Sequence, residues 1–385
     1  MYGLTATQKQ LVQTAAEIAA NVLAPEAVEV DRAARFPDAG IAALGAAGFY
    51  GLCLPQSVGG QGEPPSVYAA VVEELSAACA STAMVYVMHN TAAQVIAASP
   101  PTPARDDLLR QITQGAHLTT IAFSERGSRS QYWAPVSRLE ERKGAYVINA
   151  FKSWVTSANH ADSYVSTAQI PGAKGPLEAV LHLVRRGSPG VRIAGGFDGL
   201  GLRGNDSAPV IFDGVTVEKS DLLTALGDGT TTMLSVPLPW FNIGTSAMAV
   251  GLCRAAVTAT AAHLVGTGFE HTGERLRDLP VLRARLGEMS CRTEAARALL
   301  AYTARAMVTP DDTTTLFVLQ TRLAALEAAI EVTDLAMKTC GGAAFSRHLA
   351  LERLFRDARA GWVMAPTVDH LAEFTGRALT GLPLL

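Results

Sequence analysis

The chain has 385 residues, of which 49% are hydrophobic and 17% charged, and its formal net charge is −3. This composition excludes a disordered chain, and the length suffices for a sizeable core. The small net charge gives no electrostatic basis for binding nucleic acid or an anionic membrane surface.

Residues 1–115 are predicted to form an N-terminal helical domain. Thr5 and Gln8 have the spacing of a capping box, and apolar residues follow at helical spacing up to Pro25, which should close or kink this helix. Two Ala-rich apolar segments, residues 67–80 and 84–98, predict further helices.

Residues 116–228 are predicted to form a small central antiparallel β-barrel domain. Short β-prone segments alternate here with Gly, Pro, Asn and Asp, as is typical of strands joined by turns. These segments are residues 118–123, 146–150, 164–168, 179–184 and 210–212.

Residues 229–385 are predicted to form a C-terminal four-helix bundle, because apolar residues recur there at a spacing near 3.6. The expected helices are residues 241–264, 281–308, 314–339 and 368–379. The order of helices, β-domain and helices predicts an α+β fold class.

The five cysteines are scattered and include no Cys-x-x-Cys pair, which predicts reduced thiols in a cytoplasmic protein. The eight histidines form no cluster with metal-ligand spacing, so we expect no metal site. We see no uninterrupted apolar run near the roughly 20 residues that a membrane span needs. The first ten residues lack the pattern of a signal peptide.

Three segments carry candidate binding residues. The first is a strand followed by a Gly/Ser turn, in which Phe123, Ser124 and Ser130 are placed to hydrogen-bond a flavin edge or a pyrophosphate. An ordinary strand-end loop is the alternative. The second holds Trp154 and Thr156, and core packing is the alternative for the tryptophan.

The third segment contains Gly341 and Gly342, followed by a run of mixed arginine, acidic and apolar residues. Paired glycines allow a backbone to approach another group closely, because no Cβ intervenes. The run after them is typical of a helix with one buried face.

In this order the segments resemble the acyl-CoA dehydrogenase family. Residues 124–130 are similar to the family's Thr-Glu-Pro-Gly-Ala-Gly-Ser, residues 152–156 to its Lys-x-Trp-Ile-Thr, and residues 197–217 to its Met-Gly-x-Arg-Gly-Ser-x-Thr and following strand. The resemblance implies FAD between the β-domain and the C-terminal helices, with Trp154 on the isoalloxazine and Thr156 at its N5 edge. It implies FAD contacts from Phe123, Ser124, Ser130, Trp154, Thr156, Arg275, Gly341, Gly342 and Thr367. It also implies a homo-oligomer, a dimer or tetramer, in which one subunit's C-terminal region reaches its neighbour's FAD.

The chain departs from this family where catalysis is concerned. Ala365-Pro366-Thr367 replaces the family's Glu-Gly-Thr, and the alternative position for the base falls near Phe241, which offers no carboxylate. The family's Arg-x-x-Phe-Gly motif is replaced by residues 269–273, so Arg275 is the candidate to substitute for its arginine.

Asp369 and His370 are the candidate bases. Asp369 lies one helical turn beyond Ala365, and His370 is able to transfer protons near neutral pH. A stronger alternative for Asp369 is a favourable interaction with a helix dipole. His89 is expected to be a satisfied core histidine.

The leading hypothesis is an FAD-dependent dehydrogenase of an acyl thioester, bound to CoA or to a carrier protein, with a non-standard base and a separate electron acceptor. A flavin-dependent monooxygenase served by a flavin reductase is the second hypothesis. A catalytically inactive partner subunit is the third.

Overall fold

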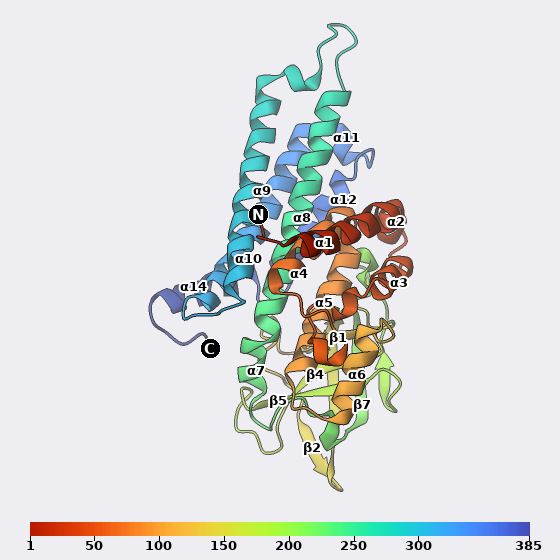
Figure 1. Ribbon diagram of the computed structural model, residues 1–385, viewed down its shortest axis with the longest axis vertical. Helices are drawn as coiled ribbons and strands as arrows, with labels where there is room; N and C mark the ends of the chain where they lie inside the picture. Colours follow the sequence, from red (N-terminus) through yellow and green to blue (C-terminus); the bar gives the residue numbers. More distant parts are fainter.

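Six α-helices form the N-terminal part of the computed structural model, which describes residues 1–385 (Figure 1). They are α1 (Ala6–Ile18), α2 (Ala24–Arg32), α3 (Asp38–Ala46), α4 (Pro65–Ala78), α5 (Ala80–Ala98) and α6 (Pro103–Thr113). The predicted capping box is confirmed, since Gln8 N donates to Thr5 Oγ1 at 3.2 Å and Thr5 N donates to Gln8 Oε1 at 3.0 Å. Pro25 does not end the first helix, because a π-helical turn, Ala19–Leu23, leads directly into α2.

The central region is a β-domain of two open sheets, so the predicted barrel is not closed. The strands are β1 (Thr119–Ala122), β2 (Leu139–Arg142), β3 (Ala145–Val155), β4 (Ser163–Gln169), β5 (Ala179–Arg185), β6 (Val191–Ile193) and β7 (Ala208–Val217). Their order is β1-β4-β5 in one sheet and β2-β3-β7-β6 in the other. A separate cluster of 16 buried residues contains side chains from both sheets.

The sheets also differ from the prediction in direction and strand number. β1 pairs with β4 in parallel, which the long connection through β2 and β3 permits, whereas the other pairs are antiparallel. The sequence did not indicate β2 and β6, because β2 is charged and mostly exposed and β6 has three residues.

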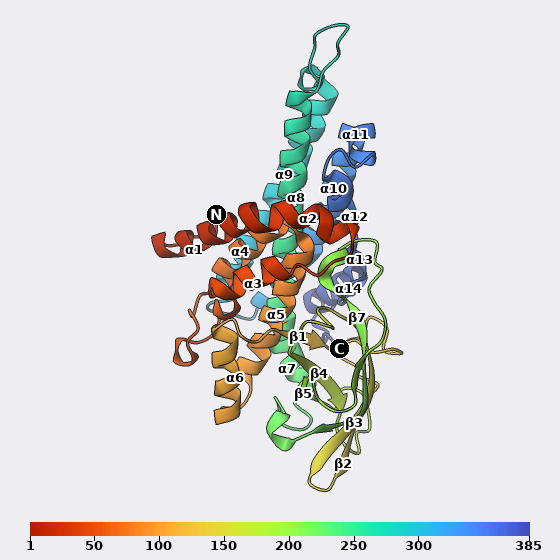
Figure 2. The same cartoon turned by 90° about the vertical axis from the view of Figure 1, so that its right-hand side faces the viewer.

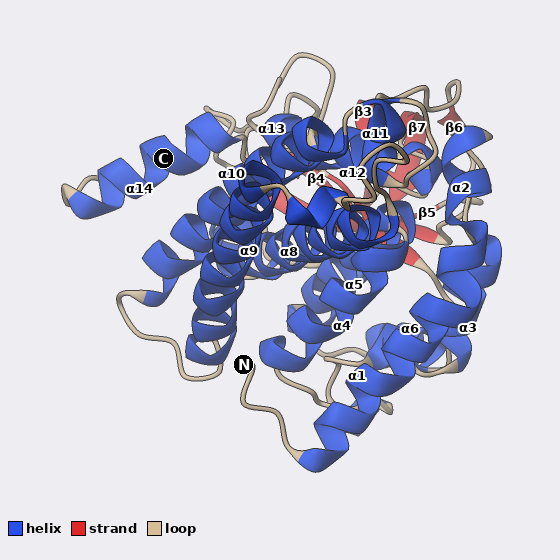
Figure 3. Cartoon of the chain, turned by 90° about the horizontal axis from the view of Figure 1, so that it is seen from above, coloured by secondary structure: helices blue, strands red, loops and turns tan.

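The C-terminal part is helical, as predicted. Its elements are α7 (Gly229–Ser235), α8 (Pro237–Gly266), α9 (Pro280–Ala306), α10 (Thr314–Cys340), α11 (Gly342–Phe345), α12 (Leu351–Ala358), α13 (Ala360–Val363) and α14 (Val368–Leu379). The long helices α8, α9 and α10 pack on one another. Helix α14 packs on α10 and extends away from the other helices (Figure 3).

Helix α8 is the central element of the molecule. The stretch Gly229–Gly266 is long and apolar enough to cross a membrane by length and composition, but α8 packs against α4, α5, α9 and α10 as a core helix. Two of its glycines permit this close packing: a Cβ at Gly244 would lie 2.3 Å from Tyr68 Oη, and one at Gly251 would lie 1.9 Å from Ser76 Oγ.

One cluster of 77 buried residues joins the N-terminal and C-terminal helices. Figure 2 shows the sheets at one end of the molecule, with α5 reaching β1 and α12 to α14 following on the same side as β7. The three parts of the chain therefore meet where the sheets end and the helices begin.

Candidate active site

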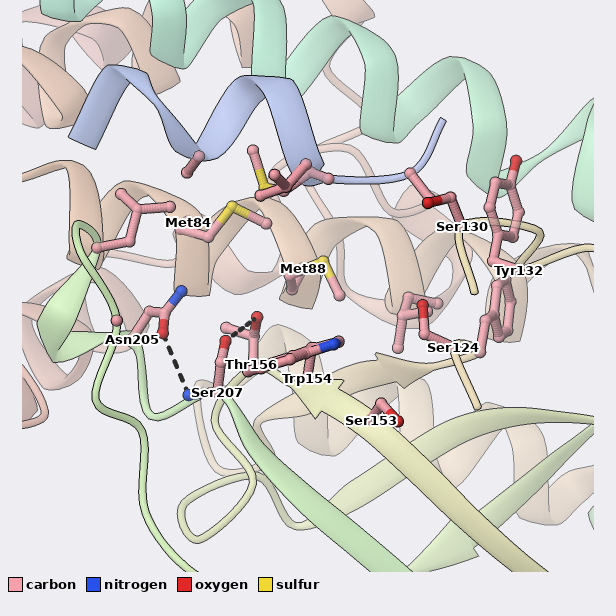
Figure 4. A pocket seen from close by; sticks show the side chains of 18 of the residues that line it. Met84, Met88, Ser124, Ser130, Tyr132, Ser153, Trp154, Thr156, Asn205 and Ser207 are labelled. Atoms are coloured by element: carbon pink, nitrogen blue, oxygen red, sulfur yellow. Dashed lines mark hydrogen bonds between the residues drawn. The ribbon is translucent and has the colours of Figure 1, made fainter. Parts of the chain in front are cut away.

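A cavity of about 1120 Å³ lies where the three parts meet. Its wall comes from α5, the segment after β1, the end of β3, residues 197–207, the start of α8, and residues 356–365. Figure 4 shows Met84 and Met88 of α5 facing Trp154 and Thr156 across this space. Half of the 32 lining residues are hydrophobic, as is usual for a small-molecule site.

Five of the predicted cofactor residues line this cavity, namely Phe123, Ser124, Ser130, Trp154 and Thr156. The residue Trp154 is 69% exposed, which is unusual for a tryptophan, and its backbone has φ +55°. A register shift between Lys152 and Val155 accompanies this conformation and interrupts the pairing of β3 with β7. The β3 end therefore presents a bare indole to the cavity.

A buried ion pair supports this wall from behind. Lys152 Nζ donates to Glu125 Oε1 at 2.6 Å and to the Thr167 carbonyl at 2.7 Å. Glu125 also accepts from the backbone N–H groups of Val136 and Ser137. Burial alone would raise the pKa of Glu125, but Lys152 and these donors hold it below its ordinary value. The pair joins the segment after β1 to β3 and β4.

The wall suits a flat ring system with polar edges and an anionic tail. Thr156 Oγ1 lies 3.2 Å from Ser207 Oγ, and the backbone N–H groups of Ser124 and Thr156 have no acceptor within the protein. Arg126 and Arg129 line the cavity without forming an ion pair. A ring stacked on Trp154 would meet the two free N–H groups, and the arginines would favour negative charge nearby.

Helix α14 holds three predicted site residues outside this wall. Thr367 is the N-cap, and its Oγ1 accepts from His370 N at 3.4 Å and lies 3.1 Å from His370 Nδ1. The His370 ring lies against Trp133 and Phe374. Asp369 is exposed in the first turn. Neither candidate base lines the cavity: Asp369 lies where an acidic side chain favours the start of α14, and His370 bonds the N-cap residue.

Gly341, Gly342 and Arg275 also lie away from the cavity. The two glycines end α10 and begin α11, and a Cβ on either would meet nothing within 4 Å. Arg275 lies in the loop between α8 and α9, where its Nη1 donates to the Gly266 carbonyl at 3.1 Å. Figure 1 shows this loop at the end of the bundle opposite the sheets. Contacts from these residues to FAD of a second subunit stay a prediction.

Both positions that resemble the family's base sites do lie on the wall. Ala365 and Phe241 line the cavity, and neither carries a carboxylate. The single carboxylate of the lining is Glu125, which is paired with Lys152. His89, expected in the core, is fully buried, accepts from Thr119 N and contacts the Tyr50 carbonyl, and burial lowers its pKa to about 3. The cavity thus contains no free carboxylate or imidazole.

Sequence reasoning missed a cation behind this wall. Arg322 of α10 is fully buried, with Nη1 donating to Asn242 Oδ1 and Nη2 to the Met364 carbonyl, each at 3.0 Å. Burial lowers its pKa to about 9, so it stays charged at neutral pH. The sequence pattern does indicate that Arg322 is buried. Arg322 lies four residues after Val318 and four residues before Leu326, on the apolar face of α10.

Three family models match successive parts of the chain: the acyl-CoA dehydrogenase N-terminal domain over residues 5–116, the middle domain over 120–215 and the C-terminal domain over 227–376. Together they account for all three structural parts, in order.

Individual relatives agree. A cyclohex-1-ene-1-carbonyl-CoA dehydrogenase of Geobacter metallireducens is 25% identical over 380 residues, covering 98% of this chain and 99% of its own. The mitochondrial short-chain specific acyl-CoA dehydrogenase of Homo sapiens is 28% identical over 359 residues, covering 92% and 86%. The structure of butyryl-CoA dehydrogenase from Megasphaera elsdenii superposes with a TM-score of 0.93 at 22% identity, covering 98% and 99%, and so shares the fold. The chain belongs to the acyl-CoA dehydrogenase family of flavin oxidoreductases.

Proposed function

We propose that this protein is an FAD-dependent enzyme that dehydrogenates an acyl thioester between Cα and Cβ. The proposal is carried by the wall of Trp154, Thr156 and Ser124, which offers an exposed indole and free N–H donors inside a cavity built by all three family domains. The relatives named above are dehydrogenases of CoA thioesters, which supports the same substrate class.

The residues of this chain position the cofactor and the acyl group. Bound FAD supplies the acceptor for the hydride that leaves Cβ. Trp154 would stack on the ring system, and the N–H groups of Ser124 and Thr156 would hold its polar edge. Met84 and Met88 face the same space and provide an adaptable apolar surface for the acyl chain.

Dehydrogenation requires removal of the α-proton of the acyl group, and the cavity contains no free carboxylate or imidazole to remove it. A base within about 3 Å of that proton is required, directly or through one water. Ala365 and Phe241 occupy the two wall positions where the family resemblance places a carboxylate. Absence of a general base typically costs about 10² to 10⁴ in rate. We therefore expect slow oxidation of simple saturated acyl thioesters.

The same observation favours a second candidate, a flavin-dependent monooxygenase. Oxygenation by reduced flavin and O₂ needs no base for an α-proton, so a cavity without a free carboxylate is compatible with it. The electron donor in that case is a flavin reductase, whereas a dehydrogenase passes electrons to a separate acceptor protein.

Anaerobic titration of the purified protein tests the proposal. We expect yellow protein whose flavin absorbance bleaches with a thioester drawn from a panel of acyl groups. Yellow protein that no thioester bleaches, but that forms product with a flavin reductase and O₂, would replace the dehydrogenase with the monooxygenase. Colourless protein that cannot be reconstituted with FAD would indicate an inactive partner subunit.

A further inference from the structure

Tyr132, Phe241 and Met364 all line the cavity, and Arg322 lies directly behind Phe241 and Met364. The guanidinium carbon of Arg322 is 4.7 Å from the centre of the Phe241 ring, and its Nη2 bonds the Met364 carbonyl. Figure 4 shows Tyr132 at the end of the cavity opposite Asn205. A positive charge therefore stands behind the wall that Phe241 and Met364 form.

This charge has no counterion in the protein. Arg322 forms no ion pair, its two hydrogen-bond acceptors are neutral, and its Nε has no partner although it is buried. The neighbouring Asn242 Nδ2 also lacks a partner. A buried charge without a partner is costly, so the site is favourable to an anion that supplies the missing charge.

Tyr132 adds a donor on the same wall. Its hydroxyl forms no hydrogen bond in the protein, although the ring is packed against Phe123 and Trp133. Burial raises the pKa of this phenol, and the Arg322 charge offsets the rise in part. The hydroxyl thus keeps its proton at neutral pH and can donate it in a hydrogen bond.

We propose that this end of the cavity receives a carboxylate carried by the acyl group of the substrate, with Tyr132 donating to it and Arg322 supplying the compensating charge. Tyr132 is the contacting residue, and Arg322 is a positioning residue that acts through the wall. The inference rests on the proposed function, because it specifies the acyl group within the thioester class.

Binding measurements separate this inference from catalysis. CoA thioethers lack the carbonyl and cannot be oxidised, so their dissociation constants from the FAD-loaded protein can be measured by calorimetry. The series carries a terminal carboxylate on two to five methylene groups, and each is compared with the neutral carboxamide of equal length. We expect at least one carboxylate to bind about tenfold or more tightly than its carboxamide.

Variants assign the preference to these residues. Arg322→Met should abolish the preference, Arg322→Lys should retain part of it, and Tyr132→Phe should weaken it several-fold. Tyr50→Phe is the matched control, because Tyr50 is a buried tyrosine whose hydroxyl bonds the Ile41 carbonyl outside the cavity. If Arg322→Met does not fold, the preference of the wild-type protein and the effect of Tyr132→Phe test the inference.

Equal binding of acid and amide at every length would overturn the inference and leave the proposed function standing. A preference that survives both Arg322→Met and Tyr132→Phe would also overturn it. Failure of both series to bind would instead remove the proposed thioester function, and the inference with it.

Discussion

Ala365→Glu places a carboxylate on the cavity wall at the position where the family resemblance expects one. If the protein is a dehydrogenase that lacks an efficient base, this variant should gain turnover with simple saturated acyl thioesters. Removing a general base costs about 10² to 10⁴ in rate, which sets the upper range of the gain.

The neighbouring cation reduces this gain. Arg322 Nη2 bonds the carbonyl of Met364, the residue before Ala365, so the new carboxylate lies near an uncompensated charge. Opposite charges roughly 5 Å apart attract by about 3 kcal/mol at an effective dielectric constant of about 20. That energy lowers the pKa of the carboxylate by about two units and makes it a weaker base. We therefore expect a gain of about 10- to 100-fold in the single variant and a larger one when Arg322→Met is added.

The assay is anaerobic stopped-flow reduction of the flavin by a saturated acyl-CoA, with the flavin content of each variant matched. Ala365→Gln is the control, because it has a similar volume and no basic oxygen. A Glu variant that binds flavin and thioester but reduces no faster than wild type would refute the assignment of the missing base to this position. Equal gains in Glu and Gln would refute it as well.

Three further predictions follow from the site and its supports. Thr156→Ala removes the hydroxyl that the family resemblance places at flavin N5 and keeps the backbone N–H. It should shift the flavin spectrum and weaken FAD binding several-fold, and an unchanged spectrum and affinity would contradict the place of this hydroxyl at the flavin edge. Lys152→Met leaves Glu125 buried without its partner and should lower the free energy of unfolding by about 3–5 kcal/mol, measured in urea; a loss below 1 kcal/mol would contradict the role of the pair. Burial raises the pKa of Asp357 to about 6, so folding takes up a proton and stability falls as the pH rises from about 4 to 6. Relative to wild type, Asp357→Asn should therefore gain up to about 3 kcal/mol between pH 4 and pH 7, and a pH-independent difference would refute this.

Local sequence patterns predicted most elements because their causes are local. Helix α14 begins and ends at the predicted residues, since Thr367 provides its cap and apolar residues recur at helical spacing. Strand pairing was harder to predict from the sequence. The parallel contact of β1 with β4 joins residues more than 40 positions apart, and no short-range pattern encodes that choice.

In the candidate site, too, local motifs predicted some features and not others. The sequence by itself determined the three-part order, the family and the residues Phe123, Ser124, Ser130, Trp154 and Thr156, because the residue types and spacings of those segments are distinctive. The resemblance also predicts that Ala365 occupies the position of the family's carboxylate. Asp369 and His370 lie outside the lining of the cavity, since one helical turn along the chain can point away from a wall, and their role as bases stays a prediction.

Only the tertiary structure decided which distant side chains share one space. Arg322 reaches the cavity wall from α10, while Phe241 and Met364 arrive from α8 and from the segment before α14. Their contact depends on how the helices pack, and packing is set by side chains far apart in the chain. The uncompensated charge behind the cavity wall is therefore a property of the assembled fold, whereas the residues that line the wall near Trp154 follow from the local motifs.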